Sequence, residues 1–235
     1  PPTSGEIDYA ATSSYLQTAI EYTRSQILAV PGSGPIRGIW SYNGEKYAFR
    51  DDVGGANCVM YKASPAGWTL VELGEQMAFD AGTTEFVVDE TLTGATSTAS
   101  GTIKGVWVTS GSWSTNDAAG YLCLHTVSGT FQDNESITSA SGSAAADGIN
   151  VATVLSPGGR YEFENTNFYG HSAGLRLYGV AGVNKGFEFD GSAFFKITTG
   201  MVNDAPPHLS SNHNLLFYSF VGGSVRFSRL GIPLS

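Results

Sequence analysis

Charged side chains are scarce in this chain of 235 residues, and basic ones are the scarcest. Asp, Glu, Lys and Arg make up 14% of the sequence, whereas an average domain has about 25%. The 12 basic residues are outnumbered by 21 acidic ones, so the formal net charge is −9. A nucleic-acid reader needs a basic face, and adhesion to an anionic membrane needs a basic patch. The composition argues against both classes.

Long apolar runs and a cysteine framework are also missing. No run approaches the roughly 18 apolar residues that span a bilayer, so no membrane insertion is expected. The two cysteines, Cys58 and Cys123, fall in parts of the chain that look separate. This pattern predicts two buried free thiols rather than a disulfide. No metal-ligand spacing links the four histidines, which are His125, His171, His208 and His213.

Glycine and aromatic residues, by contrast, are plentiful, with 30 glycines and 12% aromatics. A unit made of an aromatic-rich strand, a turn with glycine and a second alternating strand occurs over residues 46–73, 175–197 and 215–230. The last two copies start at Leu175 and Leu215, which are 40 residues apart. A period of about 40–45 residues with four strands is typical of a β-propeller.

The sequence therefore predicts an all-β fold of incomplete propeller-like blades, with an inserted small β domain and one N-terminal helix. The expected parts are an N-terminal arm and helix (1–35), a first blade (36–74), the inserted domain (75–155) and further blades (156–235). Two and a half blades would leave sheet faces bare. We therefore expect a longer chain or other subunits to complete the ring.

Local signals give the individual elements. A helix is expected at 13–29, capped by Ser13 or Ser14, and it would dock on a neighbouring subunit or on its own domain. Asn43-Gly44 predicts a two-residue hairpin turn, because both residues tolerate positive φ. Strands are predicted at 36–42, 46–50, 58–62, 68–73, 101–109, 120–127, 159–163, 175–180, 186–190, 194–197, 208–211, 215–220 and 225–228. The inserted domain also carries a repeat of its own, at 90–97 and 135–142.

One catalytic motif has to be weighed. Gly170-His171-Ser172-Ala173-Gly174 fits the nucleophile elbow of α/β-hydrolases, and Asp190 or Asp204 with His208 or His213 would supply partners in the right chain order. The elbow requires a helix after its serine, whereas an alternating strand follows here. The sequence also lacks the alternation of strands and helices that such enzymes need. We interpret the segment as a turn.

Acidic and aromatic side chains are the other candidates for chemistry. Glycosidases use two facing carboxylates, and Asp51-Asp52 or Glu188 with Asp190 would be such pairs. Turn formation and the wet face of a strand are the simpler interpretations. Four tryptophans, Trp40, Trp68, Trp107 and Trp113, would be able to stack on sugars if they are exposed, but Trp40 and Trp68 occupy strand positions that more often face the core. On balance the sequence predicts no catalytic, cofactor-binding or metal-binding residue and no cofactor.

Several stretches resemble propeller-type structural proteins of tailed bacteriophages. They are residues 31–51, 177–191 and 207–217, and the inserted stretches 90–97 and 127–135 resemble small β modules of phage virion proteins. In that family the chain normally continues past the third unit, which implies that Ser235 is not the native end.

The resemblance implies a structural component of the virion, in the tail nozzle, hub or tip, and no enzyme. Its expected partners are identical subunits in a ring, neighbouring tail or portal-adaptor proteins, and DNA that passes the channel without specific binding. It would be located in the virion tail, and in the host cytoplasm during assembly. The alternatives are a receptor- or glycan-binding module of the tail and, third, a propeller-type glycan hydrolase.

Overall fold

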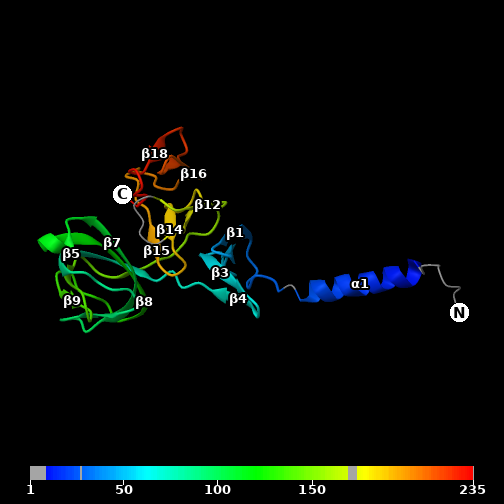
Figure 1. Cartoon of the computed structure of the whole chain (residues 1–235), viewed down its shortest axis with the longest axis horizontal. Coiled ribbons are helices and arrows are strands. Elements are labelled where there is room, and N and C mark those ends of the chain that lie inside the picture. Colours follow the sequence, from blue (N-terminus) through cyan, green and yellow to red (C-terminus); the bar gives the residue numbers. More distant parts are fainter. Residues whose placement is uncertain (1–8, 27, 169–173, 235) are drawn as a thin grey trace.

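The computed structural model describes residues 9–26, 28–168 and 174–234, and within them the fold is all-β with one N-terminal helix. Three antiparallel sheets form a stack, a barrel lies against one side of it, and the helix α1 (Tyr9–Ser25) projects from the opposite side (Figure 1). The predicted fold class is confirmed.

Each sheet of the stack is a meander in which strands pair in chain order. The first sheet contains β1 (Ile36–Tyr42), β2 (Glu45–Asp51), β3 (Cys58–Ser64) and β4 (Gly67–Leu70). The second sheet contains β12 (Glu162–Thr166), β13 (Arg176–Val180), β14 (Phe187–Phe189) and β15 (Phe194–Lys196). The third sheet contains β16 (His208–Asn212), β17 (Leu215–Ser219) and β18 (Val225–Phe227). The repeated units of the sequence correspond to the antiparallel pairs β2–β3, β13–β14 and β17–β18.

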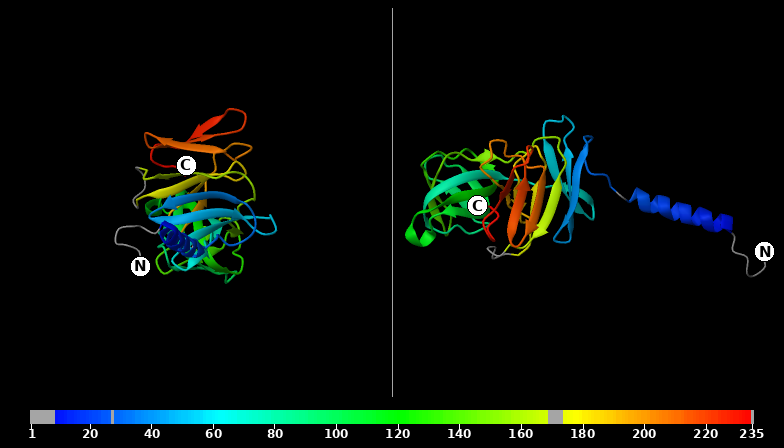
Figure 2. Two further views of the ribbon diagram at one scale, coloured as in Figure 1. Left: turned by 90° about the vertical axis from the view of Figure 1, so that its right-hand side faces the viewer. Right: turned by 90° about the horizontal axis from the view of Figure 1, so that it is seen from above.

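The sheets stack face to face in the order first, second, third, as the blue, yellow and red layers of Figure 2 show. Alternation along a strand sends successive side chains to opposite faces. Leu177 and Phe194 of the second sheet accordingly pack toward the first sheet, whereas their neighbours Tyr178 and Phe195 pack toward the third. The middle sheet is therefore covered on both faces.

Contact between the first and second sheets depends on aromatic rings. Phe49 stacks on Tyr161 with ring centroids 4.4 Å apart, and Trp40 stacks on Phe163 at 5.6 Å. A side chain at Gly38 would place its Cβ 2.7 Å from the Cβ of Tyr161. Glycine at this position therefore lets the two sheets approach closely enough for the rings to stack.

The chain that follows α1 packs against part of the outer face of the first sheet. Trp68 Nε1 donates a hydrogen bond to the carbonyl of Leu28 at 2.9 Å, and the Arg50 guanidinium donates to the carbonyls of Val30 and Gly34. Val30 is buried. These bonds hold the extended segment against the sheet.

The inserted strands form a closed barrel. They are β5 (Glu75–Thr84), β6 (Thr91–Gly94), β7 (Ser100–Ser110), β8 (Ala118–Ser128), β9 (Ser136–Thr138) and β10 (Ser143–Ala146), with β11 (Val151–Ala152) added to the edge of β5. They pair in the order β5-β8-β7-β6-β9-β10, and β10 pairs back to β5. Phe79, Leu92 and Phe131 fill the interior, and Trp113 of the short 3₁₀ helix Trp113–Thr115 stacks on Phe79 at 5.3 Å.

The repeat inside the barrel has a structural counterpart in two glutamates. Glu135, at the start of the second copy, accepts hydrogen bonds from the backbone N–H groups of Thr96 and Ser97 in the turn at the end of the first copy. Glu90, at the start of the first copy, accepts from the N–H and hydroxyl of Ser141 in the turn at the end of the second. Each carboxylate thus fixes the turn of the other copy.

Several local predictions were wrong. The helix spans Tyr9–Ser25 rather than 13–29, so Ser13 and Ser14 lie inside it and cap nothing at its start. It buries no residue and projects away from the sheets, so in this structure the helix does not pack on its own domain (Figure 1). The strand predicted at 159–163 begins at Glu162, because Gly158 and Gly159 adopt positive φ and form a turn.

Other predictions were correct. Asn43 and Gly44 have φ of 50° and 81° and close the β1–β2 hairpin. Cys58 and Cys123 are free and buried, and burial raises the pKa of each thiol to about 11.

Candidate functional site

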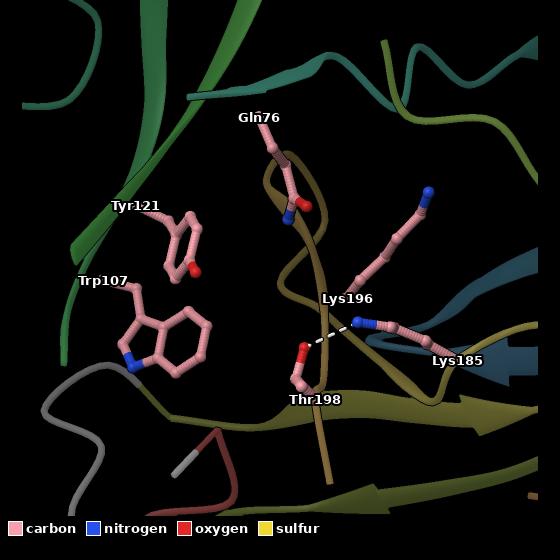
Figure 3. Close-up of a pocket in the computed structure, with 6 residues that line it drawn as sticks. All are labelled: Gln76, Trp107, Tyr121, Lys185, Lys196 and Thr198. Atoms are coloured by element: carbon pink, nitrogen blue, oxygen red, sulfur yellow. Dashed lines mark hydrogen bonds between the residues drawn. The ribbon is translucent and has the colours of Figure 1, made fainter. Parts of the chain in front are cut away.

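A cavity of about 340 Å³ lies where the barrel meets the second sheet (Figure 3). The barrel contributes one wall, and the second sheet with its following loops contributes the other. The lining residues are Gln76, Trp107 and Tyr121 from the barrel and Lys185, Lys196 and Thr198 from the sheet side. Figure 3 shows the two rings on one side and the two lysines on the other, with a ribbon of the chain passing between them.

The aromatic wall is built by strand pairing. Trp107 of β7 and Tyr121 of β8 are direct cross-strand partners, and their rings stack with centroids 5.4 Å apart at 28°. Phe195 of β15 meets the Trp107 ring edge-on at 6.2 Å. This ring pair belongs to the barrel, and the second sheet holds it in place.

A glycine permits that docking. A Cβ at Gly105 would lie 2.6 Å from the Cβ of Ala193 and 2.8 Å from the ring of Phe195. Since contacts this short are sterically forbidden, β7 reaches the second sheet because residue 105 has no side chain. The pocket therefore depends on a close approach that one missing methyl group allows.

The opposite wall carries two positive charges on a protein whose formal charge is −9. Lys185 Nζ donates to Thr198 Oγ1 at 2.9 Å and lies 3.9 Å from Asp204 Oδ2. Within residues 9–26, 28–168 and 174–234, the Lys196 ammonium has no hydrogen-bond or ion-pair partner. Burial, with a smaller contribution from Lys185, lowers the pKa of Lys196.

The carboxylates considered as catalytic candidates have structural roles. Asp51 is paired with Arg37 at 2.6 Å and accepts from the N–H of Gly158, and the bond from Arg37 lowers its pKa despite burial. Asp52 accepts from the N–H groups of Ala56 and Asn57 and closes the turn between β2 and β3. The two side chains of this pair are thus directed at different partners.

Glu188 does not lie on a wet strand face, so that interpretation was wrong. It is 5% exposed, accepts a hydrogen bond from Tyr178 at 2.8 Å and lies 3.4 Å from the guanidinium of Arg176. Burial and the neighbouring carboxylate raise the pKa of Tyr178. Asp190, which the sequence placed on the same strand, instead follows β14 and accepts from the N–H groups of Ser192 and Ala193 in the β14–β15 turn.

The elbow motif at 170–174 cannot be assessed, because His171 and Ser172 lie outside the described residues. Of its proposed partners, Asp204 binds Thr199, His208 lies 2.9 Å from Glu162, and His213 has φ of 48° in the β16–β17 turn. His125 is buried, and burial lowers its pKa. In the described ranges no three His, Cys, Asp or Glu side chains gather closely enough to hold a metal ion.

The tryptophans separate into different roles. Trp40 and Trp68 hold the first sheet to its neighbours, and Trp113 packs into the barrel core. Trp107 is the tryptophan that lines a pocket. The sequence favoured the core for Trp40 and Trp68 but gave no signal that separates Trp107 from Trp113, because the wall opposite Trp107 comes from residues about 80 positions later.

Apolar side chains are exposed outside the pocket on the helix and on the third sheet, among other places in the described residues. The helix α1 presents Tyr15, Leu16, Ile20 and Tyr22, each more than half exposed. The outer face of the third sheet presents Val225 and Phe227, which are 58% and 67% exposed, and Phe227 packs on Phe217 at 5.9 Å. On the outer face of the first sheet, the chain after α1 packs beside Arg50 and Trp68, while Ile39 and Leu70 remain 56% and 65% exposed.

No protein-family model, curated protein or solved structure matches this chain. Among the described residues, no helix combines the length and the apolar character that crossing a membrane requires.

Proposed function

We propose that this chain is a non-catalytic structural subunit of a tailed-phage virion, located in the tail nozzle, hub or tip. The observation that supports this most directly is the open outer face of the third sheet. The second sheet lies between two other sheets, and both of its faces are covered. The outer face of the third sheet would be covered in the same way if a neighbour packed against it. A propeller-like stack extended by neighbouring copies would cover the third sheet in the same way.

The proposed partner of this face is a second copy of the chain. A contact between two different surfaces of identical subunits generates a ring when the rotation closes. The exposed Val225 and Phe227 would supply one surface, and the exposed face of α1, with Leu16 and Ile20, the other. Both are apolar, and exposed apolar patches of this kind mark protein interaction sites.

The acidic composition fits the proposed position around a DNA channel. Like charges repel, so walls with a net charge of −9 per subunit would let DNA pass without binding it. Neighbouring tail or portal-adaptor proteins would contact the remaining surfaces. Assembly would take place in the host cytoplasm and the finished protein would reside in the virion tail.

The alternatives differ in what favours them. A glycan hydrolase needs two facing carboxylates, and the candidates Asp51, Asp52, Glu188 and Asp190 are each committed to a structural partner. A glycan-binding module is favoured by one observation, the cavity with an aromatic wall beside Trp107.

Sedimentation velocity at micromolar concentration tests the structural proposal. We expect the wild-type chain to form oligomers and Phe227→Glu to shift it toward monomer, because a buried unpaired carboxylate opposes association. Ile149→Glu, at an exposed barrel position, is the matched control and should not change the distribution. A wild-type chain that stays monomeric would contradict the proposal.

A further inference from the structure

We propose that the cavity between the barrel and the second sheet binds an acidic sugar, that is, a sugar unit carrying a carboxylate or a phosphate. This goes beyond the structural role and does not depend on ring assembly. The pocket has three features that together define the ligand: a ring pair, an unpaired ammonium and neutral polar groups.

The ring pair sets the shape of the ligand. Trp107 and Tyr121 stack on each other, and Tyr121 remains 40% exposed although it is large and apolar. Exposed aromatic rings stack on the C–H face of a sugar or on the face of a nucleobase. Both kinds of ligand have a flat apolar surface with polar groups at its edge. The cavity volume of about 340 Å³ lies at the lower end of the range of about 300–1,000 Å³ for small-molecule pockets. It therefore suits a ligand of one or two rings.

The opposite wall sets the charge of the ligand. Lys185 is already bonded to Thr198 and lies near Asp204, whereas Lys196 has no partner among the described residues. A partly buried ammonium without a partner is costly, and an anion in the cavity would relieve that cost. A lysine binds an anionic oxygen as a point charge, so it accepts a carboxylate or a phosphate.

Gln76 supplies the neutral polar group. Its amide lies between the two walls in Figure 3, and its Nε2 makes one long contact of 3.5 Å with the carbonyl of Phe194. The amide oxygen makes no hydrogen bond within the described part of the chain and would accept one from a ligand hydroxyl, while Nε2 would donate to a ligand. Hydroxyls on a ring are the groups that such an amide recognises, which favours a sugar over a bare anion.

The position of the pocket gives the binding a structural consequence. Each wall belongs to a different unit, so a ligand would bridge the barrel and the second sheet. Binding would stabilise the docked arrangement over any arrangement in which the barrel moves away, because the ligand binds only where both walls are present.

Isothermal titration calorimetry with the whole chain tests the proposal. The probes are a glucuronate-containing tetrasaccharide, a glucose phosphate, a neutral cellulose tetrasaccharide, inorganic phosphate and adenosine monophosphate. We expect one of the two acidic sugars to bind at least tenfold more tightly than the neutral sugar and inorganic phosphate, since a charge-assisted contact and ring stacking each contribute roughly that factor. Which acidic sugar binds distinguishes a uronate from a phosphate source.

Matched variants locate the site. Lys196→Gln and Trp107→Leu should each weaken acidic-sugar binding about tenfold or more, and the thermal midpoint of each variant, measured in parallel, checks that it is folded. Lys62→Gln removes the same charge from an exposed strand position outside the pocket and should leave binding unchanged. If Trp107→Leu does not fold, Tyr121→Ala replaces it.

Four outcomes would overturn the proposal. They are equal affinity for inorganic phosphate and the acidic sugars, tighter binding of the nucleotide than of any sugar, undiminished binding by Lys196→Gln, and no binding of any probe. Failure here would leave the sedimentation result for ring assembly untouched, and failure of assembly would leave this binding untouched.

Discussion

The barrel and the stacked sheets hide apolar surface in two different ways. The barrel turns its apolar face inward and pairs its last strand with its first, so its core comes from its own strands. A sheet in the stack has two faces, and each is covered only by whatever lies beside it. This difference indicates where association is expected. A closed barrel needs no neighbour to cover its apolar face, whereas the last sheet of a stack does.

The largest effect should come from removing a ring between sheets. Phe49 is fully buried and contacts Tyr161, Phe163 and Phe187. Phe49→Ala should lower the free energy of unfolding by about 3–5 kcal/mol. Hydrogen exchange during urea unfolding should show the stacked sheets opening while the barrel stays protected.

The matched variant for the barrel is Ile103→Ala, at a fully buried core position. It should cost about 2–5 kcal/mol and open the barrel first. If Phe49→Ala and Ile103→Ala each unfold the whole chain in one transition, the two regions are a single cooperative unit and the comparison fails.

The next effect concerns the junction between the two regions. Gly105→Val places atoms where Ala193 and Phe195 lie, so it should cost about 3 kcal/mol and detach the barrel without unfolding it. Limited proteolysis of the connections at 71–74 and 153–161 should speed up. Gly54→Val, where the nearest atom to a new Cβ lies 3.8 Å away, should leave proteolysis unchanged.

A smaller effect, confined to the barrel, depends on pH. Burial of Glu135 opposes its ionisation, but hydrogen bonds from Ser97, Gln132 and Thr96 outweigh it and lower the pKa from 4.5 to about 2. Its stabilising effect is present above pH 4.5 and is lost as the pH falls toward 2. Glu135→Gln should cost about 1–2 kcal/mol at neutral pH and flatten this acid dependence, as followed by circular dichroism.

The corresponding variant of the other copy is Glu90→Gln. Hydrogen bonds from Ser139 and Ser141 also lower the pKa of Glu90, but this carboxylate is more exposed. Glu90→Gln should therefore lower the free energy of unfolding by less than Glu135→Gln does. A larger decrease would show that burial does not decide how much each of these two carboxylates contributes to stability.

The smallest effect on stability is expected at the helix. Because α1 buries nothing, deleting residues 1–25 should change the free energy of unfolding by less than about 0.5 kcal/mol. The bonds from Trp68 to Leu28 and from Arg50 to Val30 remain in that variant. A drop of several degrees in the thermal midpoint would show that the helix packs on the sheets.

The sequence predicted the sheets better than the barrel, for physical reasons. Asn43-Gly44 is a strong hairpin signal because glycine adopts positive φ at no steric cost, whereas the equivalent turn of the third sheet, His213-Asn214, contains no glycine. The strand β5 was missed because its register shifts between Phe79 and Gly82, where Ala81 has positive φ, and this interrupts the alternation.

The pocket was not predictable because its walls come from distant parts of the chain. Trp107 and Lys196 line one cavity because β7 docks on the second sheet, and Gly105 gives no sign of that role in the sequence. Local patterns report which side chains share a strand face. They do not report which two sheets meet.

The chain passes from the stack into the barrel and returns to the stack at the same point. Its first and last residues are paired, Glu75 with Ala152, and the N–H of Thr153 donates to the carbonyl of Gly74 at 2.9 Å. Because the two ends of the barrel segment lie side by side, a domain can be inserted or removed at this point at little entropic cost. Recombination at this point would exchange one barrel for another as a cassette. The surface that the barrel carries can therefore diversify while the stack stays under separate selection.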